Sequence, residues 1–125
     1  MVITDAVQRV PGQLPDLPGA VVHSGVIYTS GIVDESALHG FGRSSVEQID
    51  GALDGLIAIV EAAGGTAATI LRVEAYLASS EDLEAWAATF RARWPENPPA
   101  RTTLITHLAL PTLRVELQAI AGVNA

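Results

Sequence analysis

Residues 44–63 restrict the fold of this chain more than any other segment. Apolar residues recur there at helical spacing, at Val46, Ile49, Leu53, Leu56, Ile57 and Val60. Ser44 precedes Glu47 by three positions, which is the spacing of a capping box at a helix start. Gly64-Gly65 follows as a stop signal. The pattern predicts a long helix with one apolar stripe, which needs a second layer to cover it.

The segments around this helix have strand character. Residues 20–23 and 26–30 are two β-rich runs around Ser24-Gly25, which predicts a hairpin. An alternating strand is expected at residues 70–78, with Leu71, Val73, Ala75 and Leu77 on its apolar face. Further strands are expected at residues 1–10, 101–108 and 114–121, the last two joined by a turn at Pro111. A sheet of several strands is therefore predicted beside the helix.

A second helix is expected from Ser79 or Ser80 to Pro95. Its apolar stripe contains Leu83, Trp86, Ala87, Phe90 and Trp94, and we interpret the aromatic residues as core. The resulting order, β-β-β-α-β-α-β-β, predicts one α+β domain over residues 1–125, with two helices packed on one face of the sheet. Another subunit is the simplest cover for the other face, and the high hydrophobic content of 49% favours the same conclusion.

Charge and composition exclude several classes of function. The net charge is −7 and the chain contains no Lys, which argues against nucleic-acid partners and anionic membranes. Without Cys, the chain has no thiol chemistry and no disulfide. The histidines His23, His39 and His107 lack a metal-ligand spacing, so no metal site is expected. Neither a signal peptide nor a membrane span is recognisable, and we expect a cytoplasmic protein.

Arg101 is the first candidate for chemistry. It follows Pro98-Pro99-Ala100, and the two prolines stiffen the backbone just before a predicted strand. An Arg held in this way suits a bidentate contact with a carboxylate. The alternative is a solvated or ion-paired surface residue.

Glu116 is the second candidate. Alternation in residues 115–121 places it opposite the apolar face of its strand. A carboxylate in mid-strand is unfavourable for strand formation, and it is able to orient a water or transfer a proton. The alternative is an ion pair with Arg114 or Arg72.

Thr29-Ser30-Gly31 is the third candidate, because a glycine at a strand end allows close approach of a ligand to the backbone. The alternative is an ordinary turn.

Four segments together resemble the Rid/YjgF family of reactive imine/enamine deaminases. They are Thr29-Ser30-Gly31, the helix end at residues 59–65, Pro98-Pro99-Ala100-Arg101-Thr102, and the strand at residues 115–121. In order and spacing the resemblance covers roughly residues 17–122. It implies a chorismate-mutase-like α+β fold with a mixed sheet, assembled as a homotrimer with three clefts between subunits. It also implies an enzyme without a cofactor.

The resemblance also implies roles for individual residues. Arg101 matches the arginine that grips the substrate carboxylate, and Glu116 matches the glutamate that positions water or moves a proton. Gly31 and its neighbour Ser30 match the backbone contacts to substrate. The implied reaction is the hydrolysis of 2-aminoacrylate and related 2-imino acids to 2-keto acids and ammonia, which needs only orientation and acid–base help.

Some positions depart from the pattern of the archetypal deaminases. Leu17 replaces a tyrosine, Ile32 a glutamine and Thr103 a cysteine, and the asparagine common on the second helix is absent near Ala87. These changes make the expected pocket more apolar. Two alternatives therefore remain: a divergent enzyme of this family acting on a bulkier intermediate of an aminomuconate or biosynthetic tailoring type, and a non-catalytic trimer that binds carboxylates.

Overall fold

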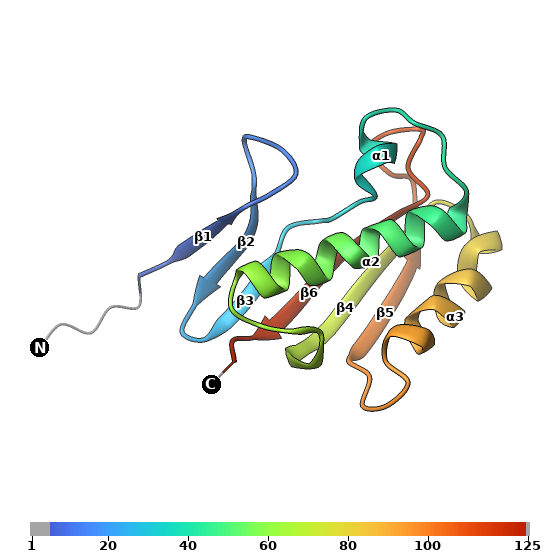
Figure 1. Ribbon diagram of the computed structural model, residues 1–125. Coiled ribbons are helices and arrows are strands. Elements are labelled where there is room, and N and C mark those ends of the chain that lie inside the picture. The colour runs from blue at the N-terminus through green and yellow to red at the C-terminus, as the bar shows by residue number, and fades with distance from the viewer. Residues whose placement is uncertain (1–5, 125) are drawn as a thin grey trace, which may run out of the picture.

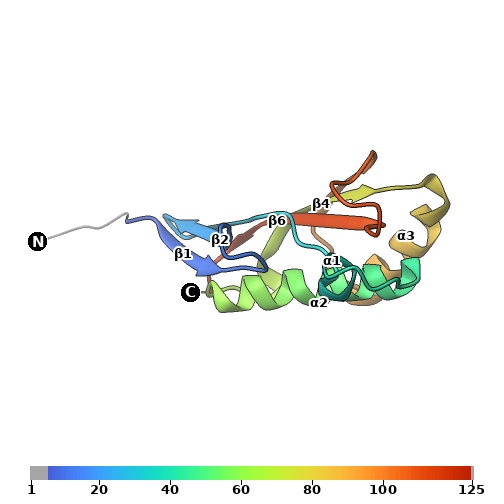
Figure 2. The same ribbon diagram turned by 90° about the horizontal axis from the view of Figure 1, so that it is seen from above.

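A computed structural model describes residues 6–124 as a six-stranded sheet with helices on one side (Figures 1 and 2). The strands are β1 (Gln8–Pro11), β2 (Pro18–His23), β3 (Val26–Thr29), β4 (Ile70–Leu77), β5 (Ala100–Ile105) and β6 (Val115–Gly122). The helices are α1 (Glu35–Leu38), α2 (Ser45–Ala62) and α3 (Leu83–Arg93), with short 3₁₀ turns η1 (Ala67–Thr69) and η2 (Ser80–Asp82). The predicted α+β class is confirmed. The short helix α1 was not expected.

The sheet is mixed, and its strand order is β1-β2-β3-β6-β4-β5. Among the described strands, only β4 and β5 pair in parallel, and the other neighbours are antiparallel. Figure 2 shows α2 and α3 on one side of the sheet, whereas no described element covers the other side. We call these sides the helix face and the open face. The last two strands were expected to be joined by a simple turn, but β4 lies between them and residues 106–114 form the loop that crosses it.

Helix α2 has the ends that the sequence predicts. The Ser44 side chain accepts a hydrogen bond from the backbone of Glu47, and the Glu47 side chain accepts one from the backbone of Ser44. After the helix, Gly64 adopts a φ of +102°, which glycine allows at little cost. Ile49, Leu53, Leu56 and Val60 of the stripe are buried, Ile57 is partly buried, and Val46 lies exposed on the first turn.

The aromatic stripe of α3 packs into the core as predicted. Trp86, Phe90 and Trp94 are buried, and their rings contact one another in turn, the first pair edge-to-face and the second tilted. Their polar atoms are satisfied, since Trp86 Nε1 donates to Thr103 Oγ1 at 3.0 Å and Trp94 Nε1 donates to the backbone oxygen of Ala67 at 3.0 Å. The prediction for Leu83 was wrong, because this residue begins the helix and is 42% exposed.

Strand β4 differs from its predicted faces at one end. The pairing of β4 with β6 is irregular between Ile70 and Arg72, which indicates a bulge there. As a result Ile70 is buried and Leu71 is 58% exposed, against the expected alternation. From Val73 onward the alternation holds.

Several strand boundaries also differ from the prediction. The final ladder bond of β5 runs from the N–H of Thr106 to the oxygen of Leu77, so the strand ends earlier than the expected residue 108. The opening strand is confirmed only as β1, and the predicted residues 1–5 lie outside the described part of the chain.

Candidate functional site

A cavity of about 580 Å³ lies at one end of the sheet, beside the start of β6. Its wall comes from the loop between β1 and β2, the end of β3, helix α1 and the loop that precedes β6. Five of the predicted site residues line it: Leu17, Ser30, Gly31, Ile32 and Glu116. The cavity therefore brings together residues that are far apart in the sequence.

Glu116 is half-buried at the rim of this cavity. It pairs with Tyr76 of β4 in the ladder, on the open face of the sheet. Both arginines that were considered as its ion-pair partners bind other carboxylates: Arg114 Nη2 lies 3.0 Å from Asp82 Oδ2, and Arg72 Nε lies 3.3 Å from Glu74 Oε1. Within residues 6–124, no hydrogen bond or ion pair engages the Glu116 carboxylate.

Gly31 lies directly beside this carboxylate. A Cβ atom at position 31 would overlap Glu116 Oε2, so only glycine leaves the carboxylate in its place. No described residue forms a hydrogen bond with the backbone N–H of Gly31. The neighbouring Ser30 hydroxyl is already engaged, since it donates to the backbone oxygen of Pro18 at 2.6 Å. The free polar groups in this corner are the Glu116 carboxylate and the Gly31 backbone.

Arg101 and Thr103 lie elsewhere. Strand β5 is an edge strand, and its residues Arg101 and Thr103 are in register with Val73 and Ala75 of β4, which point to the helix face. The Arg101 guanidinium carbon lies 4.6 Å above the centre of the Phe90 ring, where it is exposed. No carboxylate of the described chain pairs with it. Within one chain, the structure does not bring Arg101 and Glu116 together, because they point to opposite faces of the sheet.

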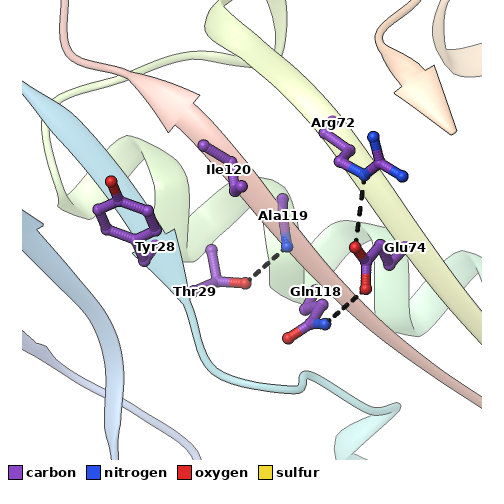
Figure 3. Close-up of a pocket in the computed structure, with 7 residues that line it drawn as sticks. All are labelled: Tyr28, Thr29, Arg72, Glu74, Gln118, Ala119 and Ile120. Carbon is purple, nitrogen blue, oxygen red and sulfur yellow. Dashed lines mark hydrogen bonds and ion pairs between the residues drawn. The ribbon is translucent and has the colours of Figure 1, made fainter. Parts of the chain in front are cut away.

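A smaller hollow of about 170 Å³ lies on the open face, and its lining residues are drawn in Figure 3. Beside it, Glu74 Oε2 accepts hydrogen bonds from the Tyr76 hydroxyl and from Gln118 Nε2, both at 2.8 Å. These bonds stabilise the carboxylate, so the Tyr76 hydroxyl first and Gln118 second lower the pKa of Glu74. The hydrogen bond to Glu74 correspondingly raises the pKa of Tyr76.

Sequence reasoning missed this network, although its signal was present. Arg72, Glu74 and Tyr76 alternate along β4, and Gln118 holds the facing position on β6, opposite Glu74. Polar residues on two central strands indicate a face that is not packed against helices. Sequence reasoning also missed Gln13, which ties the loop after β1 to the cavity: its Nε2 donates to the backbone oxygen of Val33 at 2.6 Å.

No group of three acidic, His or Cys side chains suitable for a metal ion occurs in the described part of the chain. Among the described helices, none is both long and apolar enough to cross a bilayer.

Known proteins resemble this chain in sequence and in fold. The model of the family described as Endoribonuclease L-PSP matches residues 12–123. A YjgF-family protein of Neisseria meningitidis is 24% identical, with a TM-score of 0.85 over 97% of this chain and 98% of that chain. A member of the highly conserved YjgF family from Mycobacterium tuberculosis is 19% identical, with a TM-score of 0.82 over 94% of this chain and 100% of that chain.

A Rid-family protein of unknown function from Yersinia pestis is 18% identical, with a TM-score of 0.84 over 94% of this chain and 100% of that chain. These structural likenesses confirm the fold implied by the sequence resemblance. No curated protein sequence matches the chain. The family match spans nearly all of the described residues, and the chain belongs to the family described as Endoribonuclease L-PSP, also called the YjgF or Rid family.

Proposed function

We propose that this protein hydrolyses reactive 2-imino and enamino acids to 2-keto acids and ammonia. A water oxygen bonds to the imine carbon, the carbon–nitrogen bond breaks, and the nitrogen leaves as ammonia with the protons of the water. No electrons are exchanged, so the reaction requires orientation and proton transfer alone. In this proposal Arg101 holds the substrate carboxylate, and Glu116 positions the water and transfers the proton.

The unpaired carboxylate of Glu116 carries the proposal. It is half-buried at the rim of a cavity, it has no basic partner among the described residues, and Gly31 leaves room for it. A structural carboxylate in such a place is normally paired or hydrogen-bonded. A carboxylate kept free beside a cavity is available to a water or a substrate amine.

Arg101 supports the proposal as the group that binds the substrate carboxylate. Its guanidinium is exposed on an edge strand, stacked over Phe90, and no carboxylate neutralises it within the described residues. Stacking restricts the guanidinium without using its N–H donors, which leaves them for a substrate carboxylate.

The opposite directions of Arg101 and Glu116 require a second copy of the chain. We propose that Arg101 of one subunit reaches the cavity beside Glu116 of its neighbour, in a homotrimer with three such clefts. Proteins of this family are commonly homotrimeric. The uncovered open face, with Tyr28 and Ile120 exposed on it, supports an assembly that buries this face. The exposed Leu104 and Ile105 on β5 support a contact along the edge strand as well.

Charge disfavours the ribonuclease activity that the description of the family names. The chain carries a net charge of −7. Of its seven Arg residues, Arg43, Arg72, Arg93 and Arg114 are ion-paired with acidic residues. An RNA-binding surface needs several free cations close together to contact the phosphate backbone. A deaminase of small anionic substrates needs only one.

The test is an assay with imines generated in place by an amino-acid oxidase, with 2-keto acid release measured above the buffer rate. Arg101→Ala should lower kcat/KM by about 100-fold, because truncating one member of a charge pair costs about 2–5 kcal/mol. Arg91→Ala is the matched control, since Arg91 is an exposed residue of α3 outside the cavity. A correctly assembled protein that accelerates no imine overturns the proposal. If it still binds 2-keto acids, the non-catalytic carboxylate-binding alternative takes its place.

A further inference from the structure

The wall of the cavity beside Glu116 is strongly apolar. Five leucines and one isoleucine line it, from loops, from α1 and from the bridge to β6: Leu14, Leu17, Ile32, Leu38, Leu110 and Leu113. Ile32 and Leu113 are buried beneath it, whereas Leu17 and Leu110 lie at the opening on two different loops. The accessible apolar surface is therefore concentrated at the opening, above a buried aliphatic floor.

The polar side chains in the wall do not interrupt this surface. Gln13 uses both ends of its amide on Val33, with Nε2 donating to the backbone oxygen and Oε1 accepting from the N–H. The Ser30 hydroxyl donates to Pro18. These groups hold the wall together and have little left to offer a ligand. Beyond Gln13 and Ser30, the described lining residues with a polar side chain are Glu116 and His39.

The size of the cavity is a second constraint. At about 580 Å³ it falls within the range of ligand pockets, roughly 300–1,000 Å³. A substrate as small as 2-aminoacrylate has a side chain of a single carbon. Such a substrate would leave most of the aliphatic wall in contact with water. Binding would then gain little free energy from the removal of apolar surface from water. A branched or aromatic side chain would cover the wall.

We infer that the protein prefers 2-imino acids with large apolar side chains, of the size derived from leucine or phenylalanine, over those with small side chains. This inference rests on the proposed function for the chemistry, which is the same balanced hydrolysis. It adds that the substrate side chain lies against the exposed Leu14, Leu17 and Leu110 while its imine carbon lies near Glu116. The aliphatic wall therefore acts as the specificity determinant.

The first test compares imines made from alanine, leucine and phenylalanine. The expected kcat/KM for the two larger substrates exceeds that for the smallest by about tenfold or more, because each methylene group buried in a hydrophobic pocket raises kcat/KM by about this factor. Leu17→Asn and Leu110→Asn should each reduce this ratio several-fold. Leu17 is 52% exposed and Leu110 is exposed, so neither change threatens the core. Val46→Asn is the matched control, since Val46 is also 52% exposed but lies on α2, outside the cavity.

The second test measures binding without turnover. Calorimetry compares pyruvate with 4-methyl-2-oxopentanoate, the keto acid with the leucine side chain, on the wild-type protein and on Leu17→Asn. Tighter binding of the larger acid, weakened by Leu17→Asn and unchanged by Val46→Asn, supports the inference even if no imine is hydrolysed. In that case only the proposed function fails. Hydrolysis of all imines with equal kcat/KM, or a preference for the smallest, overturns the inference and leaves the proposed function standing.

Discussion

The carboxylate of Glu116 occupies the space that a side chain at Gly31 would fill. Gly31 has a negative φ, so other residues are able to adopt its backbone conformation. The need for glycine at this position is therefore a need for space, and it arises from one carboxylate at the cavity rim.

Gly31→Ala should separate activity from stability. The new methyl group would push the Glu116 carboxylate aside, and a displacement of about 1 Å at a catalytic group can cost about 100-fold in rate. We expect kcat for imine hydrolysis to fall by about this factor while the thermal unfolding midpoint changes little, because the half-buried Glu116 side chain has room to move. Gly42→Ala is the control, since a Cβ there meets nothing within 4 Å. Wild-type kcat in Gly31→Ala would mean that the position of this carboxylate is unimportant.

Two inactive variants should regain activity when they assemble together, if the site is shared between subunits. Arg101→Ala keeps Glu116, and Glu116→Gln keeps Arg101, so a mixed trimer contains clefts in which both native residues meet. Random co-assembly of equal amounts should return about a quarter of the wild-type activity, because each cleft takes one residue from each of two neighbouring subunits. The measurement is the imine assay after joint refolding, with separately refolded variants mixed afterwards as the control. An inactive co-assembled mixture, shown by mass spectrometry to contain both variants, contradicts a shared site.

Gln48 holds the loop before β6 onto helix α2. It is 1% exposed, its Nε2 donates to the backbone oxygen of Thr112 at 2.9 Å, and its Oε1 accepts from the N–H of Arg114 at 2.8 Å. Gln48→Ala should lower the free energy of unfolding by about 2–4 kcal/mol, because each buried group left unpaired costs about 1–3 kcal/mol. Urea denaturation measures the loss, and faster hydrogen exchange at Arg114 locates it. Gln8→Ala, on the exposed surface of β1, should change stability by less than about 0.5 kcal/mol. Equal stability of the two variants would rule out this role for Gln48.

The sequence predicted those elements whose signals are local. Helix α2 was predicted closely because Ser44, Glu47 and Gly64 act within one turn of its ends. The inward residues of β6 were predicted as well, since its alternation is uninterrupted. The exposure of Leu71 was not predicted, because the bulge in β4 forms only against β6. A bulge depends on the partner strand, which no local pattern specifies.

The sequence named residues for the candidate site but not their arrangement: five of them line the cavity, whereas Arg101 and Thr103 do not. Strands β5 and β6 follow each other in the chain, yet β4 lies between them and β5 runs parallel to it. The pairing registers, Arg101 with Val73 and Glu116 with Tyr76, place the two side chains on opposite faces, and no local sequence pattern specifies these registers. The aliphatic wall was also missed in part, because Leu14 and Leu110 belong to loops without periodicity.

The hydrogen bonds on the open face predict a pH effect centred on Glu74 and Tyr76. The Tyr76 hydroxyl is the main cause of the lowered pKa of Glu74, whose ordinary value is 4.5. Tyr76→Phe removes this donor, so the pKa of Glu74 should rise toward the ordinary value. Carbon-detected NMR titration of the Glu74 carboxyl group measures the change. Tyr28→Phe is the control, because Tyr28 lies on the same face and its hydroxyl takes part in no hydrogen bond of the described residues.

The same substitution should change the pH dependence of stability with a definite sign. A carboxyl group whose pKa is lowered by folding stabilises the fold above its unfolded pKa, and this contribution disappears as the pH falls through the folded pKa. Tyr76→Phe should therefore be less stable than the wild type near neutral pH, and the part of the difference due to Glu74 should shrink in acid. The raised pKa of Tyr76 affects stability at alkaline pH. Its contribution to the stability of the fold is complete below pH 10.0 and is lost as the pH rises through the pKa of Tyr76 in the folded protein. The Phe variant has no hydroxyl to titrate and cannot show this loss. Parallel stability curves for the two proteins from acid to alkaline pH would contradict the hydrogen bond between Tyr76 and Glu74.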